Sequence, residues 1–224
     1  MMNFKKVLVV APHPDDEVIG IGGFIKKLTD NNSEVMVVTV SGHLPPLYDK
    51  EDYDRTINEA QIAHKIIGVT SSEYWEIPAT RIGDLPISEL NNKFFQLIKD
   101  FKPSLVLSPY PDRHIDHRLV FDAVMVATRP VSVGLEVSCV AAYETLSETH
   151  WNAPHIESNF IPNCVIDISE NINDKLEAAS CFESQITPFP GPRSIEAIEA
   201  LAKFRGTQSG FAYGEGLHII RLVS

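Results

Sequence analysis

The run KVLVVA at residues 6–11 has five consecutive apolar residues after its lysine. A strand of this composition has no side suited to water, so both of its faces must be covered. Strands of this kind are typical of parallel sheets that carry helices on both faces. This run therefore favours an α/β architecture in which residues 6–11 form a central strand.

The rest of the first half repeats an alternation of strand and helix. Apolar, β-branched runs predict further strands over 34–42, 73–79 and 104–110. Amphipathic patterns predict helices over 17–29, 51–67 and 86–101. Gly68 is placed to end the second helix. We expect an open, mostly parallel sheet with helices on both faces and right-handed crossovers.

The second half is less regular and contains no internal repeat or low-complexity linker. It predicts strands near 136–143, 164–168 and 217–222 and helices near 170–184 and 193–204. The most Pro/Gly-rich segment is TPFPGPRS, residues 187–194. Because nothing divides the chain, we expect a single domain over residues 1–224.

Composition excludes several classes of partner. The chain has 30 acidic and 19 basic residues, and this charge makes nucleic acid a poor partner. No apolar run approaches the ~20 residues that span a bilayer. The three cysteines form no disulfide framework or zinc pattern, which favours a reducing compartment. We expect a cytoplasmic protein that acts on a small molecule, either as a monomer or as a homo-oligomer.

Two polar clusters follow predicted strands. HPDD at 13–16 follows the first strand, and YPDRHIDH at 110–117 follows the strand over 104–110. In open parallel sheets, ligands bind outside the carboxyl ends of the strands, where the strand order reverses. We therefore expect the two clusters to face each other across one crevice.

Two histidines and one carboxylate from these clusters, His13, Asp16 and His117, form a candidate metal site with open positions. The competing interpretation is that the acids at 15–17 only stabilise a helix N-terminus. The pairing of two clusters favours the metal site. The same three ligands also occur in non-haem iron oxygenases, but an additional carboxylate beside Asp16 favours activation of water.

The remaining polar residues of the clusters suit hydrolysis. Asp15 is the predicted general base, and His114 suits either protonation of a leaving amine or stabilisation of an oxyanion. Asp116 is placed to hydrogen-bond an imidazole, although the spacing leaves open which one.

The sequence resembles the LmbE-like, or PIG-L, metal-dependent N-deacetylases. The resemblance rests on PHPDDE at 12–17, GIGG at 20–23 and HIDH at 114–117. Supporting stretches lie at 55–69, 143–151, 160–169, 175–185 and 214–222, so the resemblance covers most of the chain.

This resemblance implies a Rossmann-like fold and a Zn²⁺ ion, with another divalent metal such as Fe²⁺ as the alternative. In the family pattern the ligands are His13, Asp16 and His117, Asp15 is the base, and His114 has the oxyanion-stabilising or acid role. The implied substrate is an N-acetylglucosamine unit in a sugar or sugar conjugate. The alternatives are an amidase for another N-acyl small molecule and a non-catalytic sugar-binding protein.

Three further residues are predicted substrate contacts. Arg55 resembles an arginine that reaches the site in relatives, although a helical pair with Glu59 explains it equally well. Arg113 departs from the family pattern at the position before His114, and Trp151 could stack on a sugar. The glycines at 20, 22 and 23 lack the dinucleotide-binding spacing, so we expect them to permit close packing of a helix on the sheet.

Overall fold

The computed structural model describes residues 4–153 and 155–223, which contain a seven-stranded sheet of order β3-β2-β1-β4-β5-β7-β6. The strands are β1 (Lys6–Ala11), β2 (Glu34–Gly42), β3 (Ser71–Pro78), β4 (Leu105–Pro109), β5 (Cys139–Tyr143), β6 (Cys164–Asp167) and β7 (Gly214–Leu222). The first five strands are parallel, whereas β7 is antiparallel to both of its neighbours. The predicted mostly parallel α/β sheet is confirmed.

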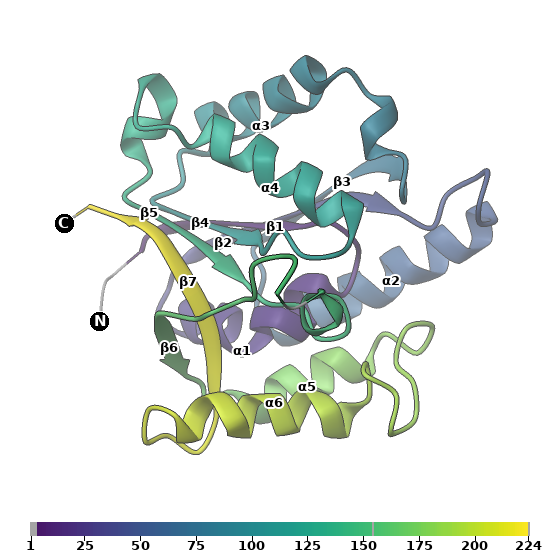
Figure 1. Cartoon of the computed structure of the whole chain (residues 1–224), viewed down its shortest axis with the longest axis vertical. Helices are drawn as coiled ribbons and strands as arrows, with labels where there is room; N and C mark the ends of the chain where they lie inside the picture. The colour runs from purple at the N-terminus through teal and green to yellow at the C-terminus, as the bar shows by residue number, and fades with distance from the viewer. Residues whose placement is uncertain (1–3, 154, 224) are drawn as a thin grey trace.

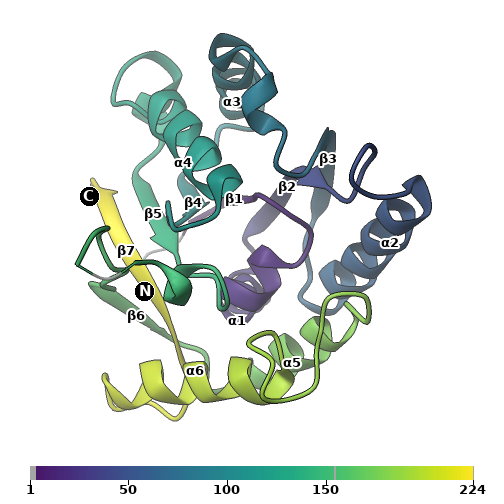
Figure 2. The same cartoon turned by 45° about the vertical axis from the view of Figure 1, so that its right-hand side comes forward.

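Helices cover both faces of this sheet, as expected. They are α1 (Asp16–Asp30), α2 (Lys50–Ile66), α3 (Ile87–Phe101), α4 (Ile115–Ala127), α5 (Ile172–Ser180) and α6 (Ile195–Thr207), with short 3₁₀ helices η1 (Ile82–Asp84), η2 (Ser132–Glu136) and η3 (Thr149–Trp151). Figure 1 shows α3 and α4 on one face and α1 and α2 on the other. Helix α5 packs on α1 and, with α6, lies outside it (Figure 2). Within the described residues, no helix has the length and apolar character needed to cross a membrane.

The central strand β1 supplies side chains to two separate cores. Leu8 and Val10 pack in the core beneath α3 and α4, whereas Val7 and Val9 pack in the core beneath α1 and α2. All four side chains are fully buried. This alternation explains why the run at 7–11 contains no polar residue.

Most predicted elements lie within a few residues of the observed ones. Gly68 follows α2 with φ +76°, at the predicted end of that helix. Two elements, α4 and β7, differ from the prediction. Helix α4 has no counterpart among the predicted helices. Its segment VFDAVMVA is almost entirely apolar and contains several β-branched valines, so it shows no amphipathic pattern that would distinguish a helix from a strand. Strand β7 begins at Gly214, earlier than predicted, and pairs antiparallel with both β5 and β6.

The glycines of α1 allow this helix to pack tightly on the sheet, as predicted. A Cβ atom on Gly20 would lie 2.5 Å from Tyr143 Cδ2, and one on Gly23 would lie 2.8 Å from Ile168 Cδ1. Both distances are too short for carbon atoms, so a larger residue would push the helix away from the strands.

A buried ion pair accommodates a break inside α1. Ile21 has non-helical angles of φ −138° and ψ 24°. The Glu215 carboxylate accepts hydrogen bonds from the backbone amides of Gly23 and Phe24, at 2.9 and 2.7 Å. Lys175 donates to Glu215 and to the carbonyl oxygen of Gly20. Together the two side chains satisfy backbone groups that the break would otherwise leave without partners.

We predict that Lys175→Met lowers the free energy of unfolding by roughly 3–5 kcal/mol, because it leaves the Glu215 charge buried without its partner. Urea denaturation followed by circular dichroism measures this. Lys203→Met is the matched control, since Lys203 pairs with Glu199 on the exposed surface of α6, and we expect little change. A loss of less than about 1 kcal/mol in Lys175→Met would contradict the proposed role of the pair.

Candidate metal and catalytic site

The sheet topology brings the two polar clusters together. Strand β1 lies between β2 and β4, and the helices that follow β1 and β4 pack on opposite faces of the sheet. The connections after the two strands therefore diverge and leave a crevice at their carboxyl ends. The centre of the His13 ring lies 4.6 Å from that of His114 and 5.6 Å from that of His117. The two segments thus face each other as expected.

The Asp16 carboxylate lies between two histidines, where the two segments meet. Its Oδ2 atom is 3.1 Å from His13 Nδ1 and 3.3 Å from His117 Nε2. Asp16 and His117 are fully buried, and His13 is partly buried. Burial alone would raise the pKa of Asp16, but the charges of His117 and His13 and the hydrogen bond from His13 hold that pKa well below its usual range.

The outer nitrogen of each histidine is held by another carboxylate. His13 Nε2 lies 3.0 Å from Asp116 Oδ2, and His117 Nδ1 lies 3.0 Å from Asp112 Oδ2. Because a carboxylate only accepts hydrogen bonds, these outer nitrogens carry protons, and the inner nitrogens face Asp16. Carboxylate partners of this kind orient the histidine ligands of metal sites.

These contacts show which imidazole Asp116 supports, and they identify Asp112 as a further carboxylate of the site. Asp116 supports His13, and its Oδ2 atom also accepts a hydrogen bond from the amide of Thr80 at 2.7 Å. Asp112 supports His117 and accepts a 2.9 Å hydrogen bond from Thr149. Sequence reasoning missed Asp112, although its place five residues before His117 in the same cluster was the available signal.

The pKa values of His13 and His117 are raised. Burial lowers the pKa of His13, but hydrogen bonds to Asp116 and Asp16 raise it to about 9. Burial also lowers the pKa of His117, but Asp16 and Asp112 raise it to about 10.

The donor atoms in this cluster suit a divalent metal. Among the described residues of this cluster, the buried atoms Asp16 Oδ1, Asp116 Oδ1 and His117 Nε2 have no hydrogen-bond partner. Imidazole nitrogen and carboxylate oxygen are ligands that zinc and iron share. A second set is also available, since one ring nitrogen each of His13, His114 and His117 lie within 4.8 Å of one another. We favour the set with Asp16, because this carboxylate already contacts both inner nitrogens and its charge offsets that of a cation.

Asp15 occupies a strained turn beside the candidate ligands. It has φ 119° and ψ −31° at the start of α1, and it is 1% exposed. Its Oδ2 atom lies 3.2 Å from Nη1 of Arg193. Burial raises the pKa of Asp15 to about 7, against the opposing effect of the Arg193 charge. Backbone strain of this kind persists where the surrounding structure enforces it, often at active sites.

His114 caps the start of α4 and faces the same crevice. Its Nδ1 atom accepts a 3.2 Å hydrogen bond from the amide of Asp116. The proton of the neutral imidazole is therefore on Nε2. Burial and the charges of His13 and His117 lower the pKa of His114 to about 4.

Of the three predicted substrate contacts, Arg113 and Trp151 lie next to each other, whereas Arg55 is held in a separate surface ion pair. Arg55 is exposed and pairs with Asp52 at 2.7 Å, not with Glu59, whose carboxylate instead accepts hydrogen bonds from Ser184. Arg113 lies beside Trp151, with its Cζ atom 5.8 Å from the centre of an exposed indole ring.

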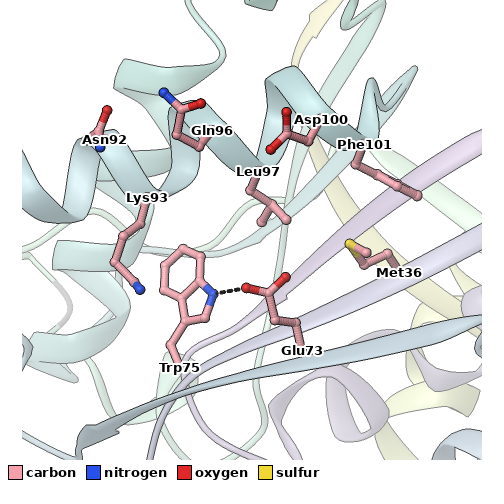
Figure 3. A pocket seen from close by; sticks show the side chains of 9 residues that line it. All are labelled: Met36, Glu73, Trp75, Asn92, Lys93, Gln96, Leu97, Asp100 and Phe101. Carbon is pink, nitrogen blue, oxygen red and sulfur yellow. Dashed lines mark hydrogen bonds between the residues drawn. The ribbon is translucent and has the colours of Figure 1, made fainter.

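A separate groove of about 500 Å³ lies between α3 and the edge strand β3 (Figure 3). Trp75 lines it, donates a 2.6 Å hydrogen bond to Glu73 and packs against Phe94 of the core. None of the predicted site residues lines this groove. It is therefore not part of the candidate site.

The fold and the cluster define an α/β protein with a candidate metal site at the switch point of its sheet. The family model for PIG-L, described as GlcNAc-PI de-N-acetylase, matches residues 8–128, which include both polar clusters. The chain belongs to the PIG-L family.

Comparisons with known proteins agree with this membership. Diacetylchitobiose deacetylase from Thermococcus kodakarensis is 30% identical over 248 residues, covering 96% of this chain and 83% of the relative. The structure of N,N'-diacetylchitobiose deacetylase from Pyrococcus horikoshii superposes with a TM-score of 0.77 at 26% identity, covering 97% of this chain and 84% of the other. GalB, a 4-carboxy-2-hydroxymuconate hydratase from Pseudomonas putida KT2440, has a TM-score of 0.79 at 20% identity and 98% coverage of both chains. Because a hydratase shares the fold, the fold alone does not determine the reaction.

We predict that His117→Ala loses bound metal whereas His114→Ala keeps one ion per chain, because only His117 belongs to the favoured ligand set. Each variant is stripped with a chelator, reconstituted with Zn²⁺, desalted and measured by mass spectrometry of the metal, with circular dichroism to check folding. Equal loss of metal in both variants would favour the three-histidine set instead.

Proposed function

We propose that this protein is a metal-dependent N-deacetylase that hydrolyses the acetamide of an N-acetylglucosamine-type sugar or sugar conjugate. His13, Asp16 and His117 would hold Zn²⁺, with Fe²⁺ as the alternative. A divalent metal supplies a Lewis acid that lowers the pKa of a bound water toward ~7 and polarises a carbonyl group. The remaining tasks fall to side chains of this chain.

The observation that carries the proposal is the arrangement around Asp16. Two histidines direct their inner nitrogens at one buried carboxylate oxygen, and their outer nitrogens are held by Asp116 and Asp112. A second carboxylate, Asp15, immediately precedes Asp16 in the same turn. Ligands with carboxylate support and an adjacent base are what a hydrolytic metal site requires.

Each remaining residue has a task that follows from its contacts. Asp15 takes the proton of the attacking water, since it is a buried carboxylate next to a ligand, and returns it to the nitrogen of the departing amine as the C–N bond breaks. His114 donates from Nε2 to the oxygen that becomes negative as the amide is attacked, because its Nδ1 already accepts a backbone hydrogen bond. The hydrogen bond at Nδ1 supports the oxyanion-stabilising role for His114 over protonation of the leaving amine.

The rim beside His114 offers surfaces suited to a sugar. Trp151 is 56% exposed, and its ring is available to the apolar face of a pyranose. Arg113 lies next to it, held by Glu148 at 3.7 Å, and can donate to sugar hydroxyl or carbonyl oxygens. Arg55, which is paired with Asp52 on the exposed surface, is the least supported of the three proposed contacts.

We predict that Asp15→Asn keeps its metal and loses at least about 100-fold in turnover, because an amide cannot accept the proton of water. The rate of acetate release and the metal content are measured on the same preparation. Asp122→Asn serves as the control, since Asp122 is exposed on α4. Turnover like that of the wild type in Asp15→Asn would rule out Asp15 as the base.

The proposed reaction itself is tested with metal-free protein reconstituted with Zn²⁺ or Fe²⁺. The substrates are N-acetylglucosamine, N,N'-diacetylchitobiose and an N-acetylated amine without a sugar. We expect metal-dependent acetate release from a sugar substrate. Release from the simple amine alone would support the amidase alternative, and no release from protein with one metal bound would contradict deacetylation of this substrate class.

A further inference from the structure

We propose that Arg193 is a positioning residue for Asp15. The proposal rests on the proposed function, in which Asp15 is the base. Arg193 lies in the Pro/Gly-rich segment 187–194, which no motif of the site includes. Its Nη1 atom is 3.2 Å from Asp15 Oδ2, although the two residues are 178 positions apart in the sequence. The segment therefore contributes a cation to a site formed by the strand ends.

The acids at positions 15–17 each have a partner from a different part of the fold. Asp16 lies between the histidines of the metal cluster, and Glu17 Oε1 is 2.9 Å from His64 Nε2 of α2. Among the described residues, the side-chain hydrogen bond to the Asp15 carboxylate comes from Arg193. Removing Arg193 leaves a buried carboxylate beside two others with nothing to fix its direction.

The guanidinium group of Arg193 is itself held in place. Its Nε atom donates to Ser147 at 3.2 Å, and Nη1 also donates to Gln185 at 3.3 Å. Glu148 lies 3.9 Å from Nη2. Arg193 therefore joins Asp15 to residues that follow β5 and α5, and its side chain is only 25% exposed.

The backbone around Arg193 forms a compact turn. Within the segment 187–194, the amide of Gly191 donates to Pro188 at 2.8 Å and that of Ser194 donates to Gly191 at 3.0 Å. A Cβ atom on Gly191 would lie 2.1 Å from Thr187 Oγ1, so the turn is too tight for another residue. Ser194 caps α6 through the amide of Ala197. Arg193 thus extends from a compact turn at the start of a helix.

Arg193→Ala and Arg193→Lys test this role. For Arg193→Ala we expect kcat to fall about 100-fold, as for a misplaced catalytic group, with little change in KM or metal content. Free guanidinium ion, added well below denaturing concentrations, should restore part of kcat in Arg193→Ala. Arg193→Lys should retain intermediate activity, because lysine keeps the charge but not the planar geometry. Arg129→Ala is the control, since Arg129 is exposed beyond the end of α4.

The outcomes separate this proposal from the proposed function. An inactive wild-type enzyme would contradict the deacetylase assignment, whereas an active wild type with equal kcat in Arg193→Ala would overturn the role of Arg193. A loss of kcat that guanidinium does not restore would also overturn it. A crystal structure of Arg193→Ala gives a readout independent of activity. We expect the Asp15 side chain to leave its present direction, and an unchanged Asp15 would contradict the proposal.

Discussion

The arrangement of the site depends on the complete burial of the Asp16 carboxylate at the end of β1. A buried charge without partners destabilises a protein by several kcal/mol, so the position requires cationic or hydrogen-bonding neighbours. His13 and His117 provide them from two adjacent strand ends. These histidines are in turn held by Asp116 and Asp112. One buried carboxylate thereby determines the positions of groups on several separate segments.

The fold around this carboxylate departs from ideal geometry in ways that the surrounding structure compensates. Asp15 has a strained backbone, and α1 is interrupted at Ile21. Glu215 and Lys175 satisfy the interrupted backbone from β7 and α5. The late elements of the chain therefore stabilise the helix that begins at the site. This connection gives a structural reason for the irregular second half of the sequence, whose strands and helices complete the surroundings of α1.

The sequence predicted the parts of the structure that local pattern determines. The runs at 7–11 and 105–107 are apolar because strands β1 and β4 are covered on both faces, so their adjacency and the meeting of the two clusters followed from general rules of parallel sheets. Helix α4 was not predicted because its sequence favours a strand as much as a helix. The antiparallel pairing of β7 depends on long-range contacts that no local pattern records.

The same distinction applies within the site. The clustered residues His13, Asp16, His114 and His117 were identifiable because they lie in two short motifs. Asp112 was missed although it lies in the second motif, since an aspartate near a histidine does not reveal which ring nitrogen it will face. Arg193 could not be placed at Asp15, because the contact depends on how the turn 187–194 packs against the residues after β5. Contacts between distant segments are the part of the site that only the folded structure provides.

We propose that Asp16, together with His13 and His117, forms a metal centre at the junction of β1 and β4. The most direct test is a crystal structure of the zinc-loaded protein, with anomalous scattering recorded on both sides of the zinc absorption edge. We expect one strong anomalous peak within bonding distance of His13, Asp16 and His117. A peak bound by the three histidines without Asp16, or no peak in this crevice, would contradict it.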